Sequence, residues 1–491
     1  METNMKRFFS ILLLIAMCLT CLISCGSEED TSSEESVGGA VVNEYINADG
    51  NYVPRHEVKD MGGKTFTIIV KGAISGTYQS DDFTTESEMY GELIEDAVQR
   101  RNDMVQSLYN VQLNVVKSDT INDDILNDCQ ASLGSYDAIM PNLPFLSTLA
   151  SQEYLCELTS LETFDAEAPW YDQNANKAFS VSNKIYFTTG DITILNKVNT
   201  PSILFNKEMA GKYFEEDFYQ LVRDKQWTFD KLVELAKEVA DIKTVNGVYS
   251  DENIYGMVSA YGDPIRFFGG SGEKITDKDS DDLPYLTIGE SERSVTIAQK
   301  ILQTYNEANW LIYAEKCEEP IWDTSFEIFY AGRSLFRQSV FSATTKLRKL
   351  SEIEFGVLPM PLMDSTQTEY YSYSTNGQTA GIAIPACAKD PEFSAYMIDA
   401  YSAWAKNTLT KAYYEVNLRY RDLRNDESDE MLDIIFGNVV YDCGECYNFG
   451  EMASIFKDMA KNGSSDVVSA IAAKKDIAKT QIDDLIALYA E

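Results

Sequence analysis

Lys64-Thr-Phe-Thr-Ile-Ile-Val70 predicts a buried β-strand, because β-branched and aromatic residues dominate the stretch. Two more strands are predicted downstream, at Val111-Gln-Leu-Asn-Val-Val116 and at Tyr136-Asp-Ala-Ile-Met140. A helical pattern over about residues 86–109 separates the first two strands, and a second helical pattern near residues 121–129 precedes the third. Strands that alternate with helices through short links predict a parallel α/β sheet. The buried stripe expected for the first helix is Leu93, Ala97, Met104 and Leu108.

Helical patterns dominate beyond about residue 200. Trp227-Thr228 predicts a helix start, with Thr228 as the N-cap and Trp227 packed onto Leu232 of the first turns. Asp390-Pro391 predicts another start, because Asp caps helices well and Pro fits the first helical position. The length of the chain, 491 residues, suggests two or three domain-sized units.

The first residues resemble a bacterial export signal. Lys6 and Arg7 precede an apolar run over residues 8–23, and the run ends in Leu22-Ile-Ser-Cys25, which resembles a lipobox. The resemblance implies that residues 1–24 are removed and that Cys25 carries lipid. The alternative is a retained membrane helix, but the run is shorter than the roughly 20 residues that a span needs. Residues 25–61 are polar and acidic and predict a disordered tether.

The formal net charge of −37 would repel a phosphate backbone, so no nucleic-acid partner is expected. Six cysteines follow Cys25 and allow fifteen disulfide pairings. Two of them form the motif Cys443-Gly-Glu-Cys446. The sequence is compatible with a local disulfide between these two cysteines and also with two buried thiols. No second such motif or nearby His completes a metal site, so neither metal nor cofactor is expected. The six are Cys129, Cys156, Cys317, Cys387, Cys443 and Cys446.

The chain contains one histidine, His56, in the expected tether. This excludes catalysis by a Ser-His-Asp or Cys-His arrangement. Catalysis by a pair of carboxylates stays possible, because 78 Asp and Glu residues are present and no spacing singles out a pair.

Several segments, in order, resemble the extracellular solute-binding proteins of family 1, the sugar-binding subunits of ABC importers. No single segment is specific, but their order spans residues 62 to about 410, whereas the last eighty residues match weakly. The segments are Tyr136–Met140 with Leu155-Cys-Glu-Leu158, Ser202-Ile-Leu-Phe-Asn-Lys207, Trp227-Thr228, Ala331-Gly-Arg-Ser334, Phe355-Gly-Val-Leu-Pro-Met-Pro361, and Gly381-Ile-Ala-Ile-Pro385 with Lys389-Asp-Pro-Glu392.

The resemblance implies an α/β, bilobal periplasmic-binding-protein-like fold, in which a hinge joins two α/β lobes. It places residues 62–192 and 345–405 in lobe one, and residues 198–340 and 406–491 in lobe two. Ligand would bind between the lobes, at the carboxyl ends of the strands. By position in the family, the implied ligand-binding residues are Tyr78, Asn142, Asp191, Tyr261, Arg337, Phe341, Tyr373 and Asn376.

The function expected from the resemblance is capture of a carbohydrate, expected to be an oligosaccharide, and its delivery to an ABC permease. The protein would act as a monomer, without catalysis, on the outer face of the bacterial cytoplasmic membrane, anchored in the lipid bilayer through Cys25. The alternatives are a cell-surface glycoside hydrolase or lyase that uses carboxylates, and a sensor or adhesion module that transports nothing.

Overall fold

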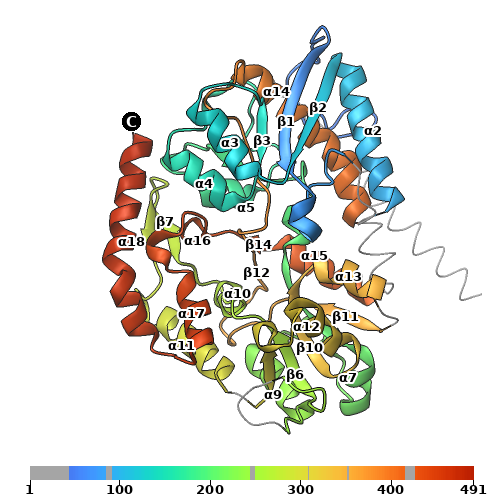
Figure 1. The fold of residues 1–491 in the computed structure, drawn as a ribbon, viewed down its shortest axis with the longest axis vertical. Helices are drawn as coiled ribbons and strands as arrows, with labels where there is room; N and C mark the ends of the chain where they lie inside the picture. Colours follow the sequence, from blue (N-terminus) through green and yellow to red (C-terminus); the bar gives the residue numbers. More distant parts are fainter. Residues whose placement is uncertain are drawn as a thin grey trace, which may run out of the picture. The chain divides into compact units, whose positions relative to one another are not determined.

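The strand β1, Lys64–Lys71, lies inside the first of two mixed sheets in the computed structural model. It pairs in parallel with β2, Val111–Ser118, and with β3, Ala138–Met140. The antiparallel strands β13, Ile382–Ala383, and β4, Phe187–Thr188, complete the order β2-β1-β3-β13-β4. The three strands predicted from the sequence are therefore confirmed, and so is the parallel pairing among them (Figure 1).

The second sheet has the strand order β11-β5-β10-β6-β9. Its edge strand β11, the last of the five along the chain, pairs antiparallel with β5, in the register Phe355↔Asn206. The chain therefore returns to the first sheet only after residue 358, later than the expected boundary at 345. The strands of this sheet are β5 Pro201–Asn206, β6 Tyr255–Ser259, β9 Leu311–Tyr313, β10 Ser334–Val340 and β11 Phe355–Leu358.

The structure describes residues 44–84, 91–243, 249–307, 309–350, 353–414 and 426–490, all within one compact unit that begins at Glu44. Two small sheets pair β12 Ser372–Tyr373 with β14 Val439–Val440, and β7 Thr276–Lys278 with β8 Pro284–Leu286. The helices are α2 Glu92–Tyr109, α3 Ile121–Gln130, α4 Leu143–Ser151, α5 Gln173–Phe179, α6 Leu195–Val198, α7 Lys207–Tyr213, α8 Phe218–Arg223, α9 Phe229–Val239, α10 Pro264–Gly270, α11 Glu292–Tyr305, α12 Ile321–Tyr330, α13 Ser342–Leu350, α14 Pro391–Ala405, α15 Asp426–Gly437, α16 Cys443–Cys446, α17 Ser454–Asn462 and α18 Val467–Ala490.

Both predicted helix starts are confirmed. The Thr228 hydroxyl accepts a hydrogen bond from the backbone N–H of Lys231 at 3.1 Å, which caps α9. The Asp390 carboxylate caps α14 by accepting from the N–H of Phe393 at 3.1 Å. Trp227 is buried with Leu232 in one apolar core.

Of the four residues predicted for the buried face of α2, Ala97 is buried and the other three are not. Leu93, Met104 and Leu108 are 43%, 44% and 41% exposed, and the buried side of the helix carries Ile94, Val98, Arg101 and Val105 instead. A search for apolar residues does not select this face of the helix, because the face contains an arginine. Arg101 is nevertheless buried, because its guanidinium donates to the backbone carbonyl of Asp82 and to the side chain of Asn102, and so has polar partners inside the protein.

The segment from Glu44 to Met61 packs onto α14 and is not part of a disordered tether. His56 Nε2 lies 3.1 Å from Asp399 Oδ2, and the His56 ring stacks on Tyr396 with the centroids 3.9 Å apart. The backbone N–H of Tyr52 donates to Asn407 Oδ1 at 2.8 Å. The prediction of disorder rests on the average polarity of the stretch. That average does not register the few residues of the segment, such as His56 and Tyr52, that form specific contacts with α14 and the residues after it.

The predicted signal peptide, the first part of the tether and the lipidation site Cys25 lie outside the described residues. Within the described ranges, no helix combines the length and the apolar character needed to cross a bilayer. The six cysteines of the body are free thiols, including Cys443 and Cys446, which are both buried.

Candidate functional site

Residues 374–379, here called the crossing segment, run from β12 toward β13 past the carboxyl ends of β1 and β3. Lys71, the last residue of β1, donates from Nζ to the backbone carbonyl of Gln378 at 2.8 Å. Asn142, which follows β3, donates from Nδ2 to the carbonyl of Gly377 at 3.1 Å. The structure therefore brings two polar side chains from strand ends to one short segment, as expected for a ligand site in an α/β fold.

The crossing segment also contacts the chain where it enters the second sheet. The hydroxyl of Thr375 donates to the backbone carbonyl of Asn199, two residues before β5, at 2.7 Å. Asn199 is fully buried, and its side-chain Oδ1 has no hydrogen-bond partner in the part of the chain that the structure describes. The crossing segment is thus bonded to residues that adjoin both sheets.

Asn376 is the most informative residue of the crossing segment. Its side chain is only 1% exposed, yet neither Oδ1 nor Nδ2 has a hydrogen-bond partner among the described residues. A buried polar group without a partner costs about 1–3 kcal/mol, so such groups are rare in the interior of proteins. An amide that offers one acceptor and two donors matches the hydroxyl groups of a polar ligand.

Burial also changes the pKa of Lys71. Desolvation lowers the pKa of its ammonium group to about 8, and the nearby carboxylate of Asp82 opposes that shift. The group is held by one backbone carbonyl, that of Gln378, in the hydrogen bond described above. An ammonium in these surroundings is a strong donor toward a polar ligand, because little water competes for it.

A second cluster of polar side chains contains Tyr78, Arg337 and Asp263. The hydroxyl of Tyr78, in the 3-10 helix η1 (Ala73–Tyr78), lies 3.5 Å from Ser342 Oγ, which connects the first lobe to the second. Arg337, on β10, donates to the carbonyl of Ser325 at 2.8 Å. Burial lowers the pKa of Arg337 to about 10, and Asp263 opposes that shift.

Asp263 sits at the start of α10 and is half-buried. Burial raises the pKa of its carboxyl group to about 6, although the carboxylate accepts from the N–H of Ala260 at 2.6 Å and from Ser259 Oγ at 2.9 Å. Close by, the N–H of Tyr261 donates to the carboxylate of Glu315, at 3.2 and 3.1 Å from its two oxygens. The region therefore contains two carboxyl groups, of which one titrates near neutral pH.

Asp191 is already engaged by other side chains of the chain. Its carboxylate lies 3.3 Å from Lys197 Nζ and 3.0 Å from Lys406 Nζ, and it accepts from Thr410 Oγ1 at 2.9 Å. Burial alone would raise the pKa of Asp191, but the two ammonium groups outweigh burial and hold the pKa below its ordinary value. A ligand hydroxyl would have to compete with these contacts.

The three remaining aromatic residues implied by the resemblance lie in packed surroundings. The Tyr373 hydroxyl donates to Asp442 Oδ2 at 2.9 Å, and the side chain is fully buried. Phe341 is also fully buried, with its ring centroid 4.7 Å from that of Phe436. Tyr261 is partly exposed, and its ring centroid lies 4.5 Å from that of Tyr313.

Two residues of the site, Lys71 and Asn199, were not among those predicted from the sequence. Lys71 follows directly on the predicted strand Lys64–Val70, and a polar residue at the carboxyl end of a parallel strand is a usable signal. Asn199 carries no comparable signal, because its place in the site depends on a contact with Thr375, 176 residues further along the chain.

No protein-family model matches this chain, and comparison with curated proteins gives no match. Solved structures do resemble it. A cyclo/maltodextrin-binding protein complexed with maltotetraose has a TM-score of 0.57 at 14% identity, over 86% of this chain and 97% of that one. A maltose-binding periplasmic protein from Listeria monocytogenes, in complex with maltose, has a TM-score of 0.55 at 15% identity, over 86% and 98%.

An ABC substrate-binding protein from the same organism, in complex with cycloalternan, has a TM-score of 0.54 at 14% identity, over 85% of this chain and 99% of that one. At such low identity these likenesses show the fold alone. The expected fold class is thereby confirmed: the chain has the bilobal α/β fold of periplasmic substrate-binding proteins, with one sheet in each lobe.

Proposed function

We propose that this chain is a substrate-binding protein that captures a carbohydrate between its two lobes and delivers it to an ABC permease. The observation that supports this proposal most strongly is Asn376, a buried amide with no partner among the described residues. It lies on the crossing segment, beside the contacts of Lys71 and Asn142. Hydrogen bonds from such fixed polar groups give a sugar its orientation.

The fold supports the same proposal. The solved structures described above, of similar fold, include complexes with maltotetraose, maltose and cycloalternan. Those ligands belong to those proteins, but they define the first compounds to test here. We also propose that the protein is anchored to the membrane by lipid on Cys25, as the sequence Leu22-Ile-Ser-Cys25 implies.

Binding is tested by thermal unfolding of the protein with each of these sugars, followed by calorimetry. A ligand that binds only the folded state raises the melting temperature, and the rise grows with the logarithm of its concentration relative to its dissociation constant. A chain that is not stabilised by any neutral mono- or oligosaccharide would argue against the proposal. The anchor is tested separately, with labelled fatty acid: wild-type protein should incorporate label, and the Cys25→Ser variant should not.

A second candidate function is hydrolysis of a glycoside by two carboxyl groups. It is favoured by Asp263, because a carboxyl group whose pKa is about 6 suits a general acid. Glu315, close by, would be the second group. Product analysis after incubation with oligosaccharides separates the two functions: shorter sugars indicate hydrolysis, and intact sugar with measurable affinity indicates binding.

A further inference from the structure

A cavity of about 330 Å³ lies between α5 of the first lobe and the β7–β14–α16 region of the second. Its volume falls within the range of small-molecule sites in proteins. None of the eight residues implied by the resemblance lines it, so it is distinct from the crossing segment. The lining residues used below are Asn174, Lys177, Lys274, Lys278, Tyr371 and Asn438.

Two of the three lysines that line this cavity have ammonium groups with weak or no ion pairing. Lys177 is exposed and forms no ion pair with any described residue. Lys274 lies 3.6 Å from Asp277 Oδ1, but the two side chains are 33% and 53% exposed, and pairs of this kind contribute little. Lys278 differs, because it pairs with Asp282 at 3.0 Å.

The charge of the cavity differs from that of the whole chain. Three lysines and one aspartate line it, in a chain whose formal net charge is −37. When the nearby Asp282 is included, the lysines still exceed the aspartates by one. In addition, Lys177 belongs to the first lobe and Lys274 to the second, so one anionic group between them would contact both lobes.

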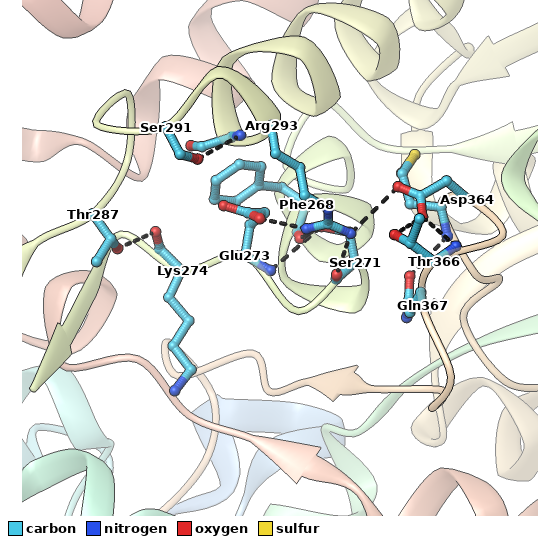
Figure 2. Close-up of polar contacts among 12 residues, drawn as sticks. Phe268, Ser271, Glu273, Lys274, Thr287, Ser291, Arg293, Asp364, Thr366 and Gln367 are labelled. Carbon is cyan, nitrogen blue, oxygen red and sulfur yellow. Dashed lines mark hydrogen bonds and ion pairs between the residues drawn. The ribbon is translucent and has the colours of Figure 1, made fainter.

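The loop that carries Lys274 is held in place by Arg293, from α11. Arg293 forms an ion pair with Glu273, donates to the carbonyl of Ser271 at 3.2 Å, and lies 3.4 Å from Asp364 Oδ2. Figure 2 shows these contacts converging on the guanidinium group, while the Lys274 side chain points away from them. Thr287 fixes the backbone of Lys274, because its hydroxyl donates to the Lys274 carbonyl at 2.7 Å.

We propose that this cavity binds the carboxylate-bearing unit of an acidic carbohydrate, such as a uronic acid. Lys177 and Lys274 contact the carboxylate from opposite lobes, and charged hydrogen bonds of this kind are stronger than neutral ones. Asn438 offers its amide group to ring hydroxyls, and Asn174 offers its amide oxygen, because Asn174 Nδ2 already donates to the carbonyl of Val439 at 2.8 Å. Tyr371 offers an apolar face to the sugar ring. Arg293 is a positioning residue, because it acts through the loop that presents Lys274.

The test is calorimetry on the full chain with glucuronate, glucose and inorganic phosphate at pH 7. We expect glucuronate to bind and the variants Lys177→Met and Lys274→Met each to weaken it at least tenfold. Lys212→Met, which changes an exposed lysine of α7, is the matched control and should leave the affinity unchanged. The uncharged glucose should not replace glucuronate in competition.

Three outcomes would overturn the proposal: no binding of glucuronate, glucuronate binding that both Lys→Met variants retain, or phosphate binding as tight as that of glucuronate. The last result would indicate a site for any anion. In the reverse direction, Lys177→Met and Lys274→Met should leave unchanged the affinity for any neutral sugar that the thermal screen identifies. The test of the cavity therefore stays separate from the test of neutral-sugar capture.

The role of Arg293 has its own readout. Arg293→Met should weaken glucuronate binding, whereas Arg293→Lys, which retains a cation beside Glu273, should restore at least part of the affinity. If both variants fold with unchanged melting temperature and unchanged glucuronate affinity, Arg293 does not position the loop.

Discussion

Replacing Asn376 by leucine should stabilise the ligand-free protein and weaken sugar binding at the same time. Leucine has nearly the shape of asparagine but no polar atoms. In the free protein both amide atoms of Asn376 are buried without a partner among the described residues, so their removal relieves a desolvation cost of about 1–3 kcal/mol. We therefore expect the free energy of unfolding to rise by about this amount, as measured by urea denaturation.

The same substitution, Asn376→Leu, should weaken the affinity for sugar. Two neutral hydrogen bonds to a sugar contribute about 0.5–1.5 kcal/mol each, so their loss weakens the affinity roughly 5- to 150-fold. The matched control is Asn142→Leu, because the Asn142 amide is satisfied: it donates to Gly377 and accepts from the N–H of Phe145 at 3.1 Å. That variant should lose stability. If Asn376→Leu also loses stability and keeps its sugar affinity, the role assigned to Asn376 is wrong.

Three more variants test the contacts around this region. Lys71→Met should change the pH dependence of stability, because the pKa of Lys71 is 10.5 in the unfolded chain but about 8 in the folded protein. Between pH 8 and pH 10.5 the wild type should therefore gain about 3 kcal/mol of unfolding free energy relative to the variant. Parallel plots of unfolding free energy against pH for the two proteins would contradict the assigned pKa. Asp191→Ala should cost about 3–5 kcal/mol of stability, because Lys197 and Lys406 lose their partner; a loss of sugar affinity at unchanged stability would instead make Asp191 a ligand-binding residue. Thr228→Ala should cost about 1 kcal/mol in urea denaturation and Thr228→Ser much less, since serine keeps the capping oxygen; equal losses would contradict the cap.

The parts of the fold that the sequence predicts correctly are those set by local rules. The strand at Lys64–Lys71 follows from its β-branched residues, and the starts of α9 and α14 follow from capping by Thr228 and Asp390. The buried face of α2 does not follow, because it includes Arg101, whose burial depends on a carbonyl 19 residues away. Local hydropathy contains no information about that partner.

Long-range contacts also decide the other differences. The segment Glu44–Met61 packs onto the body because His56 meets Asp399, more than three hundred residues later in the chain. The strand Phe355–Leu358 belongs to the second sheet because it pairs with β5, which begins at Pro201. In both cases the local sequence allows either assignment, and only the distant partner chooses between them.

In the candidate site, too, the local sequence indicates some features and long-range contacts decide the others. The resemblance pointed to Asn142 and Asn376 by position, but it could not distinguish a satisfied amide from an unsatisfied one. That difference arises from neighbours: Gly377 and Phe145 complete the hydrogen bonds of Asn142, and no described residue does so for Asn376. A pattern of residue types can thus nominate candidate residues, while the assignment of roles needs the three-dimensional arrangement of donors and acceptors.

The crossing segment is held from both sides, and this explains how Asn376 can stay in place without partners of its own. From the second lobe, Arg266 donates to the carbonyl of Ser374 at 2.6 Å, and both of its terminal nitrogens contact the carboxylate of Glu445, at 3.0 and 2.6 Å. From the first lobe, Lys71 bonds to the same segment. These contacts hold the backbone on both sides of Asn376, so under the proposed function a ligand would not have to order the segment before it meets the amide.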